Sequence, residues 1–214
     1  MGELILVRHG ETEWTLSGQH TGNTDIPLTA RGEDQARAVA PLLADRAVGL
    51  VLVSPLGRTE RTAQLAGLTD YRVTTDLHEW DYGGYEGVTT DEIHRERPDW
   101  YLWTDGVVPG DAAHPGESPE QVGARADRVL AQVRKAQAET DDDVVLVSHG
   151  HFLRVLTARH LGLAPADGRL FKLETGTVSR LGSEHDRPVI TAWNLQIPKS
   201  VLRAELRARE ASDA

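Results

Sequence analysis

The chain has 214 residues, of which 39% are hydrophobic and 26% are charged, a composition typical of one ordinary globular domain. Its formal net charge of −10 argues against non-specific binding to nucleic acid or to anionic membranes, which requires a basic surface. The absence of cysteine excludes disulfides, thiolate nucleophiles and cysteine-based metal sites. The N-terminus lacks the basic region of a signal peptide, and no stretch reaches the ~18 apolar residues of a membrane helix. We therefore expect a cytoplasmic protein.

Three short apolar runs predict strands, at residues 4–7 (LILV), 50–53 (LVLV) and 144–147 (VVLV). Short runs rich in β-branched side chains are typical of strands that are buried on both faces of a parallel sheet. Residues 177–183 and 188–194, around the turn sequence SEHDRP, predict an antiparallel hairpin at one edge of that sheet.

Helices are expected between and after these strands, over residues 30–46, 56–67, 119–138 and 151–161. Thr29 is a candidate N-cap of the first helix. The third begins with a capping box at Ser118, with Pro119 at its first position, and has an apolar stripe formed by Val122, Ala126, Val129, Leu130 and Val133. Alternating strands and helices predict a three-layer α/β/α fold around a doubly wound, mostly parallel sheet with an antiparallel edge.

Residues 76–117 differ from the rest because they are rich in Gly, Trp, Pro and Asp, with one short helical stretch near 89–96. We interpret them as a lid segment inserted over the active site, in which Trp80, Trp100 and Trp103 pack. Residues 1–198 are predicted to form a single domain, and residues 199–214 a charged C-terminal tail.

Cationic or potentially cationic side chains follow each apolar run. Arg8 and His9 follow the first, Arg58 lies shortly after the second, and His149 comes just after the third. Ligands bind beyond the carboxyl ends of the strands in an open α/β sheet, so these groups should meet at one rim. Each alone has an ordinary explanation as a packed or solvated side chain. Together, with several helix N-termini, they predict an anion site that suits phosphate.

The sequences RHGET at residues 8–12, SPLGRTERTA at 54–63 and SHGH at 148–151 resemble those of the histidine phosphatase superfamily, the phosphoglycerate-mutase-like proteins. A further segment, LHEWDYGGYEG at residues 77–87, looks like the family segment that supplies the acidic proton donor. The resemblance implies that His9 is the nucleophile, that Glu79 is the general acid and base, and that the phosphoryl group is held by Arg8, Arg58 and His149.

The same resemblance implies contacts to phosphate or substrate from Gly10, Thr15, Thr21, Gly22, Tyr82 and Gly150. The family often has Asn where this chain has Thr15, and a hydroxyl lacks the two fixed donors of an amide. Glu86 competes with Glu79 for the acid role, and the family pattern favours Glu79. His151 is interpreted either as a residue that supports the site or as an ordinary residue at a helix N-terminus.

The chemistry implied here needs neither a metal nor another cofactor. A neutral imidazole nitrogen can attack phosphorus to give a phosphohistidine, which splits one difficult displacement into two. Arginine side chains and a protonated second histidine can stabilise the charge on the equatorial oxygens. A carboxylic acid can protonate the leaving alkoxide and then take a proton from the attacking water.

The segment YGGYEG at residues 82–87 favours the phosphatase branch, because cofactor-dependent phosphoglycerate mutases typically carry a YGALQG-like segment. The chain is most similar in pattern to acid phosphatases and sedoheptulose-bisphosphatase-like enzymes. We therefore expect a phosphomonoester hydrolase that acts through a phosphohistidine on a small phosphorylated metabolite, with phosphoglycerate mutase as the alternative.

Two alternative functions, a metal-binding protein and a non-catalytic binding module, are disfavoured. A metal site on His149 and His151 would suffer repulsion from Arg8 and Arg58. A non-catalytic module that only binds phospholigands would leave His9 and Glu79 unexplained. Neither nucleic acid nor a membrane is expected as a partner, and the sequence leaves open whether the chain forms a homo-oligomer.

Overall fold

A six-stranded sheet forms the centre of the computed structural model, which describes residues 2–197 of the chain. Its strand order is β3-β2-β4-β1-β5-β6. The strands are β1 (Leu4–Arg8), β2 (Val48–Val53), β3 (Arg72–Val73), β4 (Asp143–Ser148), β5 (Val178–Glu184) and β6 (Arg187–Leu195). The first four are parallel, and the β5–β6 hairpin adds to β1 in the antiparallel sense. The mostly parallel sheet with an antiparallel edge is confirmed.

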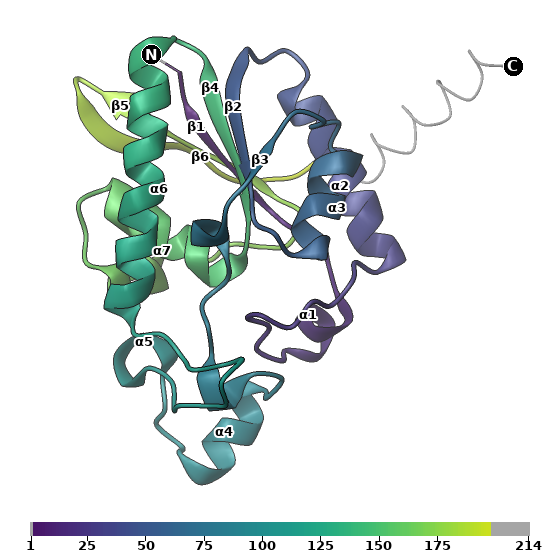
Figure 1. Ribbon diagram of the computed structural model, residues 1–214, viewed down its shortest axis with the longest axis vertical. Coiled ribbons are helices and arrows are strands. Elements are labelled where there is room, and N and C mark those ends of the chain that lie inside the picture. The colour runs from purple at the N-terminus through teal and green to yellow at the C-terminus, as the bar shows by residue number, and fades with distance from the viewer. Residues whose placement is uncertain (1, 198–214) are drawn as a thin grey trace, which may run out of the picture.

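Helices cover both faces of the sheet (Figure 1), as expected for a three-layer fold. They are α1 (Glu13–Ser17), α2 (Ala30–Leu43), α3 (Gly57–Leu65), α4 (Thr90–Glu96), α5 (Leu102–Asp105), α6 (Pro119–Glu139) and α7 (Gly150–His160). Three short 3₁₀ helices are η1 (Thr75–Leu77), η2 (Gly83–Tyr85) and η3 (Pro165–Leu170). None of these helices in the described part of the chain is long and apolar enough to cross a bilayer.

Alternation along each central strand divides the core into two layers. Leu4 and Leu6 of β1 pack with α6 and α7, whereas Ile5 and Val7 face α2 and α3. Strands β2 and β4 divide their side chains in the same way. Successive side chains of a strand point to opposite faces, so an apolar run without polar interruptions is what a sheet covered on both sides requires.

Local capping sets where the long helices begin. The Thr29 hydroxyl accepts a hydrogen bond from the backbone N–H of Gly32, and Ser118 forms the expected reciprocal capping box with Gln121. The helix predicted over 30–46 ends earlier, at Leu43, because the Arg46 side chain turns to pair with Glu3 and Asp143 at the start of the sheet. Ion pairs distant in sequence thus override helical periodicity there.

Several short elements were not predicted: α1, β3, α5 and the 3₁₀ helices. They are too short to show a periodic pattern, and α1 depends on a capping box between Thr12 and Thr15. Elements α1, α4 and α5 lie beyond the carboxyl ends of the central strands (Figure 1).

The segment 76–117 contains η2, α4 and α5, and its three tryptophans are buried within the core layer of α6 and α7. The segment is therefore continuous with the core of the sheet. The tail predicted at 199–214 lies outside the described residues, and the single-domain boundary at residue 198 stays a prediction.

Candidate active site

His9 follows β1 at the carboxyl edge of the sheet, where its backbone N–H donates to the carbonyl oxygen of Ser148 on β4 (3.0 Å). The residue is only 3% exposed, and Nδ1 lies 2.7 Å from the carbonyl oxygen of Gly10. That carbonyl accepts the Nδ1 proton, which leaves Nε2 with a free lone pair. Burial, together with the charges of Arg58 and Arg8, holds the pKa of His9 well below its ordinary value. The ring is therefore neutral, as a nitrogen nucleophile must be.

Two arginines surround this histidine. Arg8 donates from Nη1 to the carbonyl oxygen of Leu173. Arg58, in the first turn of α3, is fully buried and donates to the carbonyl oxygens of Thr24 (2.8 Å) and Gly22 (2.9 Å). Both guanidinium groups retain a buried Nε without a partner among the described residues. Since a buried polar group without a partner is costly, these N–H groups favour an anionic ligand.

His149 caps α7 without a side-chain bond to that helix, and its ring lies edge-on to that of His9, 5.2 Å between centroids. Its Nε2 is 2.8 Å from the hydroxyl oxygen of Ser54, and its buried Nδ1 has no partner among the described residues. Burial and the charge of Arg58 lower its pKa well below the usual value. The sequence suggested a protonated second histidine, but this ring is neutral until an anion stabilises the added proton.

Glu79 follows η1, and its carboxyl group is held by three backbone N–H groups. Oε1 accepts from Trp80 (2.9 Å) and Phe152 (2.8 Å), and Oε2 accepts from His151 (3.0 Å). Two of these donors belong to the first turn of α7, whose N–H groups have no partner within the helix. The position of this carboxyl group is therefore fixed by a helix 72 residues away in sequence.

Glu86, the competing acid, does not line the cavity that contains His9. Its oxygens accept hydrogen bonds from the backbone N–H groups of Gly22 and Thr24, at 2.9–3.0 Å. The same loop supplies the carbonyl oxygens that receive Arg58. Glu86 thus supports the loop that holds Arg58, whereas Glu79 shares a cavity with His9.

A cavity of about 230 Å³ brings together most of the predicted site residues. Its lining includes Arg8, His9, Thr15, Thr21, Glu79, Tyr82 and Gly150. Gly150 leaves room for Arg8, because a Cβ at that position would make a tight contact of 3.1 Å with the Arg8 guanidinium carbon. Arg58 and His149, although close to His9, are not among the residues that line this cavity, nor are Gly10 and Gly22.

Some predicted ligands already have other partners. A Cβ on Gly10 would lie 2.2 Å from the carbonyl oxygen of Gly32, so the close approach expected at Gly10 is to α2. The Gly22 N–H is taken by Glu86. The hydroxyl of Thr15 donates to Thr12 and that of Thr21 to Gln19, while the Tyr82 hydroxyl lies 2.6 Å from Nδ1 of His151.

Sequence reasoning missed several residues of the cavity wall: Trp14, Gln19, His20, Thr90, Arg154 and Leu173. None of them directly follows an apolar run, so the strand-end pattern carried no signal for them. His151, left undecided above, also lines the cavity, and burial lowers its pKa well below the usual value.

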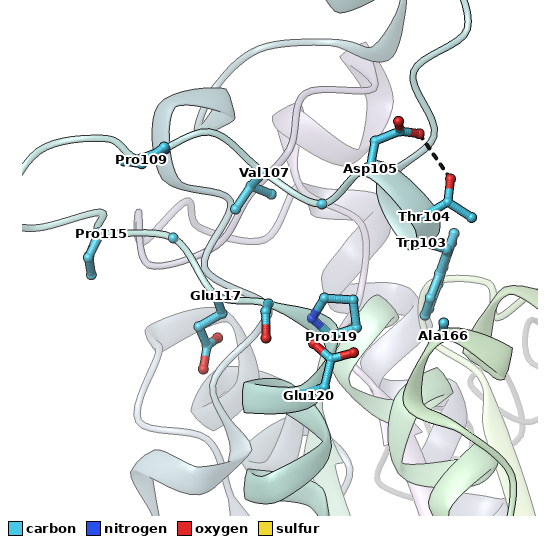
Figure 2. A pocket seen from close by; sticks show the side chains of 13 residues that line it. Trp103, Thr104, Asp105, Val107, Pro109, Pro115, Glu117, Pro119, Glu120 and Ala166 are labelled. Carbon is cyan, nitrogen blue, oxygen red and sulfur yellow. Dashed lines mark hydrogen bonds between the residues drawn. The ribbon is translucent and has the colours of Figure 1, made fainter.

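A larger cavity, about 430 Å³, lies elsewhere, between the lid segment and the start of α6 (Figure 2). Asp105, Glu117 and Glu120 line it, and no lysine, arginine or histidine is among its described lining residues. It therefore suits phosphate poorly. A neutral histidine beside two buried guanidinium groups, with a carboxyl group in the same cavity, defines instead an enzyme that transfers a phosphoryl group through histidine.

Comparison with known proteins agrees with this chemistry. A family model described as the histidine phosphatase superfamily (branch 1) matches residues 4–196. The chain belongs to the histidine phosphatase superfamily.

Named relatives and solved structures also support this family. An acid phosphatase of Mycobacterium tuberculosis is 43% identical, over 85% of this chain and 87% of its own. Sedoheptulose 1,7-bisphosphatase of Saccharomyces cerevisiae is 36% identical, over 74% of this chain and 67% of its own. The structure of an open reading frame product from Mycobacterium tuberculosis superposes with a TM-score of 0.84 at 40% identity, covering 91% of this chain and 98% of that one.

The chain is accordingly a phosphatase that hydrolyses a small phosphorylated substrate through a phosphohistidine, as expected from its sequence. The alternative, a phosphoglycerate mutase, has less support.

Proposed function

We propose that His9 is the residue that becomes phosphorylated. Its Nε2 lone pair attacks the phosphorus atom, a P–N bond forms and the P–O ester bond breaks. Glu79 donates its proton to the leaving oxygen. A water molecule then attacks phosphorus, Glu79 takes its proton, and the P–N bond breaks to release phosphate and restore neutral His9.

The set of unpaired buried nitrogens around His9 is the observation that carries these roles. Arg8 Nε, Arg58 Nε and His149 Nδ1 are three of the five buried side-chain atoms without a partner among the described residues. We assign them to the oxygens of the transferring phosphoryl group, where charge spreads in the transition state. The N–H groups that a phosphate would need are thus already present around the lone pair that would attack it.

The remaining predicted contacts have a smaller part in the proposal. Thr15, Thr21, Tyr82 and Gly150 line the cavity and contact the phosphoryl group or the rest of the substrate. Gly10 and Gly22 act through the backbone, by letting their loops closely approach α2 and the segment Trp80–Glu86, respectively, and the Gly22 carbonyl oxygen receives Arg58.

We further propose that the reaction needs no metal ion, because the charges of Arg8 and Arg58 would repel a cation from this site. The net charge of −10 supports a small anionic substrate drawn in by a local arginine pocket, and it disfavours nucleic acid and anionic membranes as partners. A cytoplasmic location is part of this proposal. Each subunit contains the complete set of proposed residues, so the mechanism is the same for a monomer and a homo-oligomer.

Labelling during turnover tests the nucleophile. The enzyme is mixed with a ³²P-labelled phosphomonoester and quenched within milliseconds. We expect an acid-labile, base-stable label on His9, which His9→Ala abolishes. His160→Ala is the matched control, because His160 lies on α7 and its Nε2 contacts the carbonyl of Gly182 rather than the site. A label that survives in His9→Ala would overturn the assignment.

Metal independence has its own test. Activity should be unchanged after treatment with a chelator and dialysis. Loss of activity that a divalent ion restores would show that the arginine set is not sufficient.

A further inference from the structure

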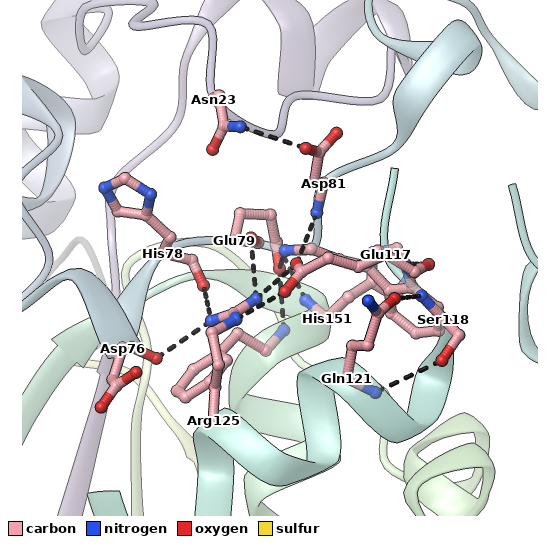
Figure 3. Close-up of polar contacts among 12 residues, drawn as sticks. Asn23, Asp76, His78, Glu79, Asp81, Glu117, Ser118, Gln121, Arg125 and His151 are labelled. Carbon is pink, nitrogen blue, oxygen red and sulfur yellow. Dashed lines mark hydrogen bonds and ion pairs between the residues drawn. The ribbon is translucent and has the colours of Figure 1, made fainter. Parts of the chain in front are cut away.

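Arg125, on the buried face of α6, makes an extensive set of contacts although it does not line the His9 cavity (Figure 3). Its side chain is 11% exposed and lies over the ring of Phe152, with Cζ 5.0 Å from the ring centroid. Its guanidinium group pairs with Glu117 through Nε (2.8 Å) and Nη2 (2.7 Å). The mechanism described above uses neither side chain.

The rest of the guanidinium group binds the backbone that leads into Glu79. Nη1 donates to the carbonyl oxygens of Asp76 (3.0 Å) and His78 (2.9 Å), and Nη2 donates to that of Glu79 itself (3.2 Å). One planar group thus fixes three carbonyl oxygens within four residues. A lysine ammonium, which is a point charge, lacks the geometry for this set.

Glu117 fixes the other side of Glu79. Its Oε2 accepts from the backbone N–H of Asp81 (3.0 Å), and its carbonyl oxygen accepts from the indole N–H of Trp80 (2.9 Å). Its own backbone N–H donates to the carbonyl oxygen of Asp81 (3.0 Å). The backbone on both sides of Glu79 is therefore attached to the start of α6.

Glu79 is consequently held from two directions. The Arg125–Glu117 pair fixes its backbone from α6, and the N–H groups of His151 and Phe152 fix its carboxyl group from α7. Phe152 takes part in both, because its ring also supports the Arg125 guanidinium group. If the contacts of Arg125 and Glu117 with this backbone are lost, the Glu79 carboxyl group can shift relative to the leaving oxygen. A misplacement of about 1 Å can lower the rate on the order of 10²-fold.

We infer that Arg125, paired with Glu117, is a positioning residue that sets the place of the Glu79 carboxyl group for proton transfer. The inference rests on the proposed acid–base role of Glu79. On this inference, Glu117 in the Gly-Glu-Ser sequence at 116–118 and Arg125 in the second turn of α6 act together to position Glu79.

Dependence on the leaving group tests this inference. The variants Arg125→Gln and Arg125→Lys are assayed with an alkyl phosphomonoester, whose leaving oxygen needs a proton, and with p-nitrophenyl phosphate, which needs little help. For Arg125→Gln we expect the rate constant of the first step, measured as pre-steady-state release of the alcohol or phenol, to fall roughly 10–100-fold for the alkyl ester and less than about 3-fold for the aryl ester. Inhibition by orthovanadate should be unchanged, because the phosphoryl pocket is intact.

Arg128→Gln is the matched control. Arg128 is also on α6 and pairs with the same segment, but through the side chain of Asp76 (2.6 Å), and it is 56% exposed. It should behave as wild type with both substrates. Arg125→Lys keeps the charge beside Glu117 and serves where the glutamine variant does not fold, with a smaller loss of the same kind expected.

Combination with Glu79→Gln separates positioning from general damage to the fold. If Arg125 acts through Glu79, Arg125→Gln should cost little further activity in the Glu79→Gln background. Equal losses in the first step with both esters, or multiplicative losses in the double variant, would overturn the inference and leave the acid role of Glu79 intact. A Glu79→Gln variant without leaving-group dependence would overturn the acid role itself, and the inference with it.

Discussion

The imidazole rings of His9 and His149 meet edge to face, with their centroids 5.2 Å apart and their planes inclined by 63°. Both rings are buried, and Arg58 is the charged group that most strongly lowers the pKa of each. Two imidazolium ions this close to each other and to a guanidinium group would repel, so both rings are neutral before substrate binds. In the proposed mechanism, a phosphate dianion beside His149 would reverse that balance and favour its protonated form, while His9 would act as the nucleophile.

The pKa of His9 in the free enzyme should lie below the ordinary value near 6.5. Arg58→Gln should raise it, because removal of a positive neighbour favours the imidazolium form. NMR titration of ¹⁵N-labelled histidine measures both values. Arg61→Gln is the control, since Arg61 is an exposed residue of the same helix that pairs with Glu33. A His9 midpoint that Arg58→Gln leaves in place would contradict the electrostatic account.

The protein should lose stability as the pH falls below about 6.5. In the unfolded chain His9 and His149 bind protons near that pH, whereas in the folded protein their pKa values are well below it. The unfolded state therefore binds more protons, and the free energy of unfolding falls by up to about 1.4 kcal/mol per pH unit for each ring. Urea unfolding at several pH values measures this slope. His149→Gln should reduce the slope by about one proton, and an unchanged slope would show that this ring is not responsible.

Glu79→Gln should retain binding of inorganic phosphate but slow the hydrolysis of alkyl phosphomonoesters by roughly 10²–10⁴-fold. The amide keeps an oxygen for some of the backbone N–H donors but must turn its NH₂ toward the others, as at Glu86, and it has no acidic proton to give to the leaving oxygen. Unlike Glu86, Glu79 does not hold the loop that receives Arg58, so phosphate binding is kept. Activated aryl phosphates should lose less in the first step, which pre-steady-state release of the phenol measures. Small and equal losses for both kinds of ester would place the acid elsewhere.

Glu86→Gln should behave differently. Both Glu86 oxygens accept from the backbone of the loop that holds Arg58, so an amide NH₂ there must face an N–H donor. We expect displacement of Arg58, roughly tenfold weaker inhibition by orthovanadate, and equal losses with alkyl and aryl esters. Glu92→Gln, in an exposed capping box on α4, is the control. A loss confined to alkyl esters would instead identify Glu86 as the acid.

The phosphoenzyme should be short-lived. With water as the normal acceptor, inorganic phosphate should appear in step with the loss of substrate, and 2,3-bisphosphoglycerate should not be needed. Assays with 3-phosphoglycerate, with and without that primer, measure the partition between hydrolysis and isomerisation. Primer-dependent isomerisation that greatly outpaces phosphate release would favour the mutase alternative while leaving His9 as the nucleophile.

The sequence by itself determined the features that depend on local chemistry. Apolar runs such as Leu4–Val7 specify strands covered on both faces, and the capping box at Ser118 begins α6 where the pattern predicts. The rule that parallel strands end at one rim was enough to bring Arg8, His9 and His149 together. Short-range periodicity and capping need no knowledge of the rest of the chain, which is why they could be read from the sequence.

Only the tertiary structure decided which carboxylate faces His9 and what holds it there. Glu79 and Glu86 lie in one short segment, yet the first meets the N–H of Phe152, 73 residues away, and the second meets that of Gly22, 64 residues away. The contacts of Arg125 with the backbone of Glu79 and of the residues before it span 46 to 49 residues. Such pairs form because packing of α6, α7 and the lid segment places unpaired backbone groups beside particular side chains, and no local pattern encodes that placement.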